Sequence, residues 1–155
     1  MIDFFLEESS IDTVSYQSIT GIICIQVDSL YFPEQHWNDN IVTILDWWSN
    51  GFIALNDGIN NSYDFHFMDG PFEYRIYKTA LNVYMLELKT GRLAGITKVE
   101  MGEIDLQGTI DNFAKALNRL ILFFRRSRSS NDEIKKLEQN YSRLMATIAL
   151  KKSNS

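Results

Sequence analysis

The sequence has few of the residues on which small enzymes and metalloproteins most often depend. Its 155 residues include one cysteine, Cys24, and two histidines, His36 and His66. A single cysteine excludes an intrachain disulfide, and two distant histidines do not supply the three or four spaced ligands of a zinc site. Phosphate-loop and nucleophile motifs such as G-x-S-x-G are also missing. The sequence therefore predicts no catalytic residue set, no metal site and no cofactor.

Long hydrophobic segments are missing as well. The longest apolar run near the C-terminus covers residues 120–124 and stops at Arg125, whereas a membrane-spanning helix needs about 20 apolar residues. The N-terminal residues are acidic and their apolar run is short, which does not fit a signal peptide. One cysteine suits a reducing compartment. Together these features predict a soluble, cytoplasmic protein that does not contact a membrane.

Apolar and aromatic residues, in contrast, are plentiful. They make up 45% and 13% of the chain, which is enough for a hydrophobic core, and the length is that of one domain. We therefore expect a single domain over residues 1–155.

The most regular pattern is an alternation of aromatic and polar residues on both sides of Asp69-Gly70-Pro71. Phe65 and Phe67 precede this tripeptide, and residues 72–77 alternate again after it. A period of two is typical of β-strands, and Asp, Gly and Pro all favour turns. This stretch predicts two antiparallel strands joined by a structural turn. Further strands are predicted at residues 21–27, 83–88 and, less regularly, 96–104.

The C-terminal third changes to helical spacing. Apolar residues recur every three or four positions over residues 110–124 and again over 134–148, which predicts two helices, and the short connection makes them an antiparallel pair. Strands followed by helices indicate an α+β fold. We expect an antiparallel sheet with the C-terminal helices packed on it: a mixed sheet region over about 1–106 and the helical pair over about 109–150.

One further segment, residues 38–56, allows two interpretations. Its apolar spacing is helical overall, but its first residues alone would also suit a strand. Residues 49–51 are expected to end either element. A helix is favoured after Trp47, and residues 41–46 are left open.

Capping residues give the expected helix starts. Asn38 or Asp39 is expected to cap the helix in the ambiguous segment, and Thr109 is expected to cap the first C-terminal helix. Ser130 and Glu133 form the pattern of a capping box for the second.

Charge is distributed unevenly along the chain. Residues 1–108 contain sixteen acidic and five basic residues, whereas residues 109–155 contain four acidic and ten basic residues. Arg125 and Arg126, at a predicted helix end, either complement the helix dipole or bind a phosphate or acidic partner. The acidic region either forms ordinary solvated faces or attracts a basic partner, and it disfavours nucleic acid. The candidates for a binding surface are Asp57, Asp64, Glu73, Glu100, Glu103 and Asp105.

Two segments carry a resemblance to a known group of proteins. They are FPEQHWNDNIVTILDWW, residues 32–48, and FHFMDGPFEYRIY, residues 65–77. Their pattern resembles that of small bacterial immunity proteins, which are encoded beside polymorphic or contact-dependent toxins and neutralise the toxin domain by binding it. The matching residues are Pro33, Trp37, Asp39, Trp47-Trp48 and Phe67-Met68-Asp69-Gly70-Pro71. The resemblance names neither the toxin nor the residues that bind it.

The resemblance and the acidic charge predict the same kind of function. They imply an immunity protein, not an enzyme, that blocks a cognate toxin domain, expected to be basic and nuclease-like, by steric and electrostatic contact. The alternative is a small-molecule-binding or enzymatic α+β domain that uses an aromatic pocket. A large secreted toxin gene directly upstream would favour the first function, and metabolic neighbours would favour the second.

Overall fold

The computed structural model describes residues 1–12, 18–92, 95–127 and 132–154. Within these residues the strands are β1 (Asp3–Asp12), β2 (Thr20–Val27), β3 (Leu30–Phe32), β4 (Asn38–Asn40), β5 (Ser62–His66), β6 (Phe72–Ala80), β7 (Val83–Thr90) and β8 (Thr97–Ile104). The helices are α1 (Ile41–Asn56), α2 (Leu106–Arg126) and α3 (Asp132–Ser153). The predicted α+β class is therefore confirmed.

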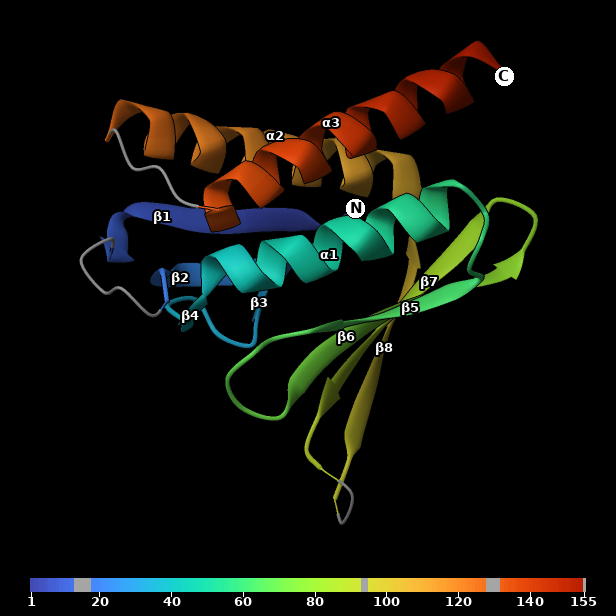
Figure 1. The fold of residues 1–155 in the computed structure, drawn as a ribbon. Coiled ribbons are helices and arrows are strands. Elements are labelled where there is room, and N and C mark those ends of the chain that lie inside the picture. The colour runs from blue at the N-terminus through green and yellow to red at the C-terminus, as the bar shows by residue number, and fades with distance from the viewer. Residues whose placement is uncertain (13–17, 93–94, 128–131, 155) are drawn as a thin grey trace.

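The strands form two antiparallel sheets (Figure 1). In the first sheet β2 lies beside β1 on one side and pairs with β3 and β4 on the other. The second sheet has the order β5-β6-β7-β8 and contains the expected hairpin, in which Phe65 lies opposite Tyr74. The predicted alternation of residues 72–77 lies within β6, whereas on the other side only Phe65 and His66 lie in β5, and Phe67 follows its end. Strand β1 was not predicted.

Helix α1 occupies the segment that the sequence left open. It begins at Ile41, and its N-cap is Asn40, whose side chain accepts a hydrogen bond from the backbone N–H of Thr43 at 3.2 Å. The predicted caps Asn38 and Asp39 were wrong, because both lie in β4. The expected stop at residues 49–51 was also wrong. A Cβ on Gly51 would lie 2.5 Å from the ring of Tyr63, so this glycine lets the second sheet pack closely against the helix.

Asp39 joins two segments that lie 30 positions apart in the sequence. Its carboxylate is 1% exposed and accepts hydrogen bonds from Trp37 Nε1 at 2.9 Å and from the backbone N–H of Asp69 at 3.1 Å. Gly70 has a φ of +70°, and the ring of Phe72 lies 5.0 Å from that of Trp37. Trp37, Asp39 and Asp69, which belong to the resemblance, therefore meet in a structural contact between β4 and the β5–β6 turn.

The hydrophobic core lies between the two sheets and the helices. Phe52 of α1 is its centre: ring centroids lie 5.8 Å away at Phe4 of β1, 4.6 Å away at Phe65 of β5 and 4.8 Å away at Phe113 of α2. Aromatic rings contribute large buried areas and favourable edge contacts. One residue of α1 thus contacts both sheets and α2.

Helix α2 packs against the first sheet. It begins at Leu106, four residues before the predicted first residue Ile110, and its N-cap is Asp105. The prediction of Thr109 as N-cap was wrong: Thr109 is buried, and its hydroxyl accepts a hydrogen bond from the backbone N–H of Ile2 at 3.0 Å. This bond ties the start of the chain to the helix.

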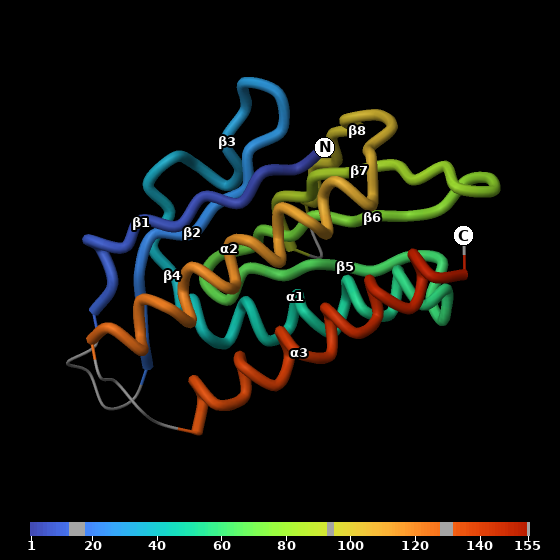
Figure 2. The backbone as a smooth tube through the Cα atoms, turned by 90° about the horizontal axis from the view of Figure 1, so that it is seen from above, coloured from blue at the N-terminus to red at the C-terminus, as the bar shows by residue number. Residues whose placement is uncertain are grey.

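Helix α3 runs antiparallel to α2 and packs against both α2 and α1 (Figure 2). Asn140 donates to Asp46 Oδ1 of α1 at 2.7 Å, and Lys136 Nζ lies 3.0 Å from Asp46 Oδ2. Arg125 of α2 lies 3.5 Å from Glu138. The predicted capping box at Ser130 lies outside the described residues. No helix in the described part of the chain is long and apolar enough to cross a membrane.

Candidate interaction surface

The second sheet has one face in the core and one face in solvent, and the exposed face carries most of the predicted acidic residues. Phe65, Tyr74 and Leu86 are buried, and alternate residues on the same strands point the other way. We call the exposed side the outer face. Its cross-strand pairs are His66–Glu73, Asp64–Arg75, Glu73–Lys89, Arg75–Glu87, Glu87–Glu100, Lys89–Lys98 and Met85–Glu103. The fold therefore brings together four predicted candidates: Asp64, Glu73, Glu100 and Glu103.

Two of these candidates already have cationic partners. Lys89 Nζ lies 3.4 Å from Asp64 Oδ1 and 3.7 Å from Glu73 Oε1. Arg75 Nε lies 3.9 Å from Asp64 Oδ1, and His66 Nδ1 lies 3.1 Å from Glu73 Oε2. Because Lys89 and Arg75 compensate their charges, Asp64 and Glu73 attract an external cation less strongly than isolated carboxylates would.

The β7–β8 side of the outer face has two acidic residues next to each other. Glu87 and Glu100 are cross-strand partners, and the Tyr77 hydroxyl donates a hydrogen bond to Glu100 Oε2 at 2.9 Å. Hydrogen bonding with Glu100 is the main cause that raises the pKa of Glu87, followed by burial and by the charge of Glu100. Like charges on neighbouring strands destabilise each other. A partner's cation placed between the two carboxylates would relieve this repulsion.

Sequence reasoning missed Glu87. The alternation of residues 83–88 places Glu87 on the exposed side of a predicted strand, and that signal was present in the sequence. Its pairing with Glu100 depends on the register of β8, which shifts by a bulge between the pairs Leu86–Gly102 and Glu87–Glu100. A pattern in one strand does not predict such a shift.

The other two predicted candidates do not lie in these cross-strand pairs. Asp57 is exposed and follows the last turn of α1, where its backbone N–H bonds to the carbonyl of Ile53 at 2.9 Å. Asp105 caps α2, and its Oδ1 accepts a hydrogen bond from the backbone N–H of Gly108 at 3.1 Å. Asp105 therefore has a structural role whether or not it also contacts a partner.

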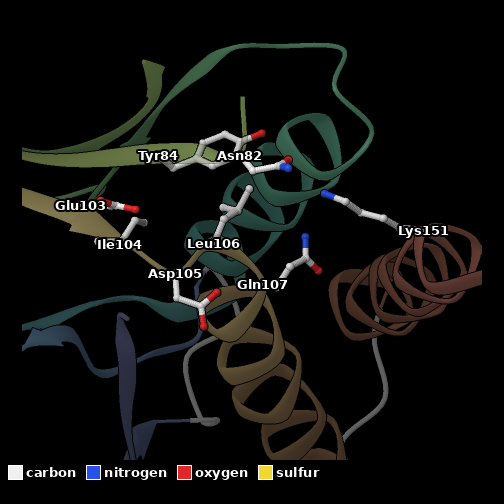
Figure 3. Close-up of a pocket in the computed structure, with 8 residues that line it drawn as sticks. All are labelled: Asn82, Tyr84, Glu103, Ile104, Asp105, Leu106, Gln107 and Lys151. Carbon is white, nitrogen blue, oxygen red and sulfur yellow. The ribbon is translucent and has the colours of Figure 1, made fainter. Parts of the chain in front are cut away.

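A pocket of about 550 Å³ opens where β8 meets α2 (Figure 3). Its walls come from the β6–β7 turn, the end of β8, the start of α2 and the last turn of α3. The residues that line it are Asn82, Tyr84, Glu103, Ile104, Asp105, Leu106, Gln107 and Lys151. Two predicted acidic candidates thus line this pocket. Its single aromatic side chain, Tyr84, does not make it the aromatic pocket of the alternative function.

The chemistry expected of other residue types is limited by burial. Cys24 is fully buried, its Sγ lies 3.6 Å from the carbonyl oxygen of Gln35, and burial raises the pKa of the thiol to about 11. At neutral pH this thiol stays protonated and is a poor nucleophile. The described residues contain no group of three or more His, Cys, Asp or Glu side chains that could hold a metal ion.

No protein-family model, curated protein or solved structure matches this chain. The chemistry of its surface is therefore interpreted from its own residues. The excess of negative charge is concentrated in residues 1–61, which contain nine acidic residues and no lysine or arginine. Residues 72–104, from β6 to β8, contain four acidic and five basic residues. The outer face therefore offers a partner the neighbouring carboxylates of Glu87 and Glu100, which lie among the cations Arg75, Lys89 and Lys98 of the same face.

Proposed function

We propose that this chain is an immunity protein that binds a cognate toxin domain in the cytoplasm and neutralises it by steric and electrostatic blocking. The observation that carries the proposal is the set of acidic side chains on the outer face, above all Glu87, Glu100 and Glu103 on β7 and β8. Neighbouring carboxylates of this kind attract a cationic group on the surface of a partner protein. The resemblance of residues 32–48 and 65–77 to immunity proteins supports the same function.

The toxin that fits this surface has a basic face. Nucleases bind the phosphate backbone of their substrate through Lys and Arg, so an acidic protein surface that covers such a groove excludes the nucleic acid. A domain of this kind is blocked without any chemical step by the immunity protein. We therefore propose a nuclease-like toxin, although the acidic face itself specifies only the partner's charge.

The contact is expected to combine two effects. Exposed carboxylates on the outer face raise the association rate. A carboxylate that becomes buried in the complex and pairs with a cation of the toxin lowers the dissociation rate. Glu100, which already accepts a hydrogen bond from Tyr77, is held in place on the sheet and loses little side-chain freedom on binding. The outer face is thus partly ordered before the partner arrives.

The test is growth rescue. The proposal predicts a toxin domain encoded beside this gene, and that domain is expressed from an inducible promoter in cells that contain the wild-type chain, the double variant Glu87→Lys/Glu100→Lys, or no immunity protein. We expect growth with the wild type and arrest with the empty control, and we expect reduced rescue with the double variant. The control variant is Glu133→Lys/Glu138→Lys on α3, which makes the same change in net charge away from the outer face.

Two results would contradict the proposal. Cells that arrest despite abundant wild-type protein would show that the chain does not neutralise this toxin. A wild-type chain that rescues growth without forming a complex with the purified toxin domain would show that blocking by contact is not the mechanism.

A further inference from the structure

The pocket between β8, α2 and α3 has charges of both signs on facing walls (Figure 3). Glu103, at the end of β8, and Asp105, before α2, lie on one side. Lys151 reaches toward the pocket from the last turn of α3 on the other side, and the side chains of Leu106 and Tyr84 lie between the two sides. The pocket therefore presents two carboxylates, an apolar centre and an ammonium group.

The charged groups at its mouth are available to a partner. Glu103 and Lys151 are exposed, and in the described part of the chain neither takes part in an ion pair of the fold. Behind them the wall is anchored: Gln107 Nε2 donates to Asn56 Oδ1 of α1 at 3.0 Å, and Asn56 is buried. Exposed charges on a fixed wall can form ion pairs with a bound partner without unfolding the protein.

We propose that this pocket receives a segment of the toxin domain that carries a cationic side chain, which faces Glu103 and Asp105, and a carboxylate, which faces Lys151. The inference rests on the proposed function and adds the chemistry of one contact to it. A volume of about 550 Å³ holds more than a single side chain, so the occupant is a short stretch of chain with both charges. Leu106 and Tyr84 provide the apolar surface that its carbon atoms cover.

The sign of the effect at Lys151 separates this local contact from long-range attraction. If the acidic surface acted only through its summed field, Lys151 would oppose a basic toxin, and removing its charge would strengthen binding. If Lys151 pairs with a carboxylate in the pocket, reversing its charge weakens binding instead. At Glu103 both mechanisms predict weaker binding, so Lys151 is the decisive position.

The experiment measures affinity and rate constants between the neighbouring toxin domain and the full chain at fixed ionic strength by surface plasmon resonance. The variants are Glu103→Lys and Lys151→Glu. Their controls are Glu133→Lys and Lys135→Glu, which make the same charge changes at the other end of α3. We expect each pocket variant to raise Kd by about tenfold or more through faster dissociation, and the controls to change it by about twofold at most. Urea midpoints of the pocket variants should equal that of the wild type, because neither side chain is buried.

The outcomes distinguish a failure of the proposed pocket contact from a failure of the proposed immunity function. Tight wild-type binding with a Lys151→Glu variant that binds equally well or more tightly overturns the pocket contact and leaves the immunity function in place. Unchanged binding of Glu103→Lys overturns it as well. The failure of the wild-type chain to bind the toxin domain overturns the proposed function and the pocket contact together.

Discussion

Replacing Asp39 by Asn should destabilise the protein although the two side chains have the same size. Asp39 Oδ1 accepts from the backbone N–H of Asn40 at 2.7 Å, Oδ2 accepts from Trp37 Nε1 at 2.9 Å, and the backbone N–H of Asp69 lies within 3.2 Å of both oxygens. An amide has one oxygen and one donor group. In either orientation the amide NH₂ of Asn faces the indole N–H or the N–H of Asn40, and one buried hydrogen bond is lost.

The size of the stability loss follows from the one buried hydrogen bond that is lost. A buried donor left without an acceptor costs about 1–3 kcal/mol, and hydrogen bonds to a charged acceptor are stronger than those to a neutral one. Because Asp39 is 1% exposed, solvent does not easily replace the lost acceptor. We expect a loss of about 2–3 kcal/mol in the free energy of unfolding, a large part of the typical 5–15 kcal/mol.

Equilibrium unfolding in urea, followed by tryptophan fluorescence and circular dichroism, measures this loss. The matched control is Asp69→Asn, which removes the same charge from an exposed side chain while the backbone N–H of Asp69 still reaches Asp39. A stability of Asp39→Asn within about 0.5 kcal/mol of the wild type, or an equal loss in both variants, would refute the structural role given to this carboxylate.

Three other predictions concern the fold. Gly70→Val should lower the free energy of unfolding by about 1 kcal/mol or more in a urea titration, because Gly70 has a φ of +70° and a β-branched residue tolerates that region poorly; unchanged stability together with lost toxin binding would mean that the turn is a binding site instead. Leu120→Ala should cost about 2–5 kcal/mol in the same assay, since Leu120 is 1% exposed in the core; a fully stable domain after truncation at Arg126 would contradict the packing of α3. Cys24 should react with a thiol reagent only when the protein unfolds, because it is buried and its thiol pKa is raised; rapid labelling of the native protein would disprove this.

The sequence predicted those elements whose patterns are local. The alternation around Asp69-Gly70-Pro71 identified the β5–β6 hairpin, and the spacing of apolar residues identified α2 and α3, because side-chain period alone distinguishes strands from helices. Strand β1 was missed because only its start is buried: Phe4 is in the core, whereas much of the rest is exposed or half-buried. Without a regular buried side there is no period to detect.

Other features depend on contacts between distant segments. Residues 41–46 suit a strand as well as a helix by composition, and the helix is decided by the Asn40 cap and by packing of α1 against both sheets and α3. Asp39 has a side chain typical of a helix N-cap, but its carboxylate accepts hydrogen bonds from Trp37 and from the backbone of Asp69 instead. Tertiary contacts of this kind override local capping preferences.

The candidate surface was predicted only in part, because it too depends on contacts between distant segments. Acidic residues of β5, β6 and β8 share the outer face because these strands belong to one sheet, and the order of the strands could not be predicted from the sequence. Glu87 was overlooked, and the cations that pair with Asp64 and Glu73 were not assigned to the same face. Composition predicted the excess of negative charge, whereas register and strand order decide where it is uncompensated.

The most direct test of the proposed function is the association rate constant between this chain and the neighbouring toxin domain as a function of salt concentration. The acidic outer face predicts association on the order of 10⁸ M⁻¹s⁻¹ or faster at low salt, with a steep decrease as salt screens the charges. The variant Glu87→Lys/Glu100→Lys should associate more slowly and depend less on salt, while Glu133→Lys/Glu138→Lys should behave much more like the wild type. A tight complex whose association rate is independent of salt and of Glu87 and Glu100 would contradict the electrostatic mechanism, and the absence of any complex would contradict the immunity function itself.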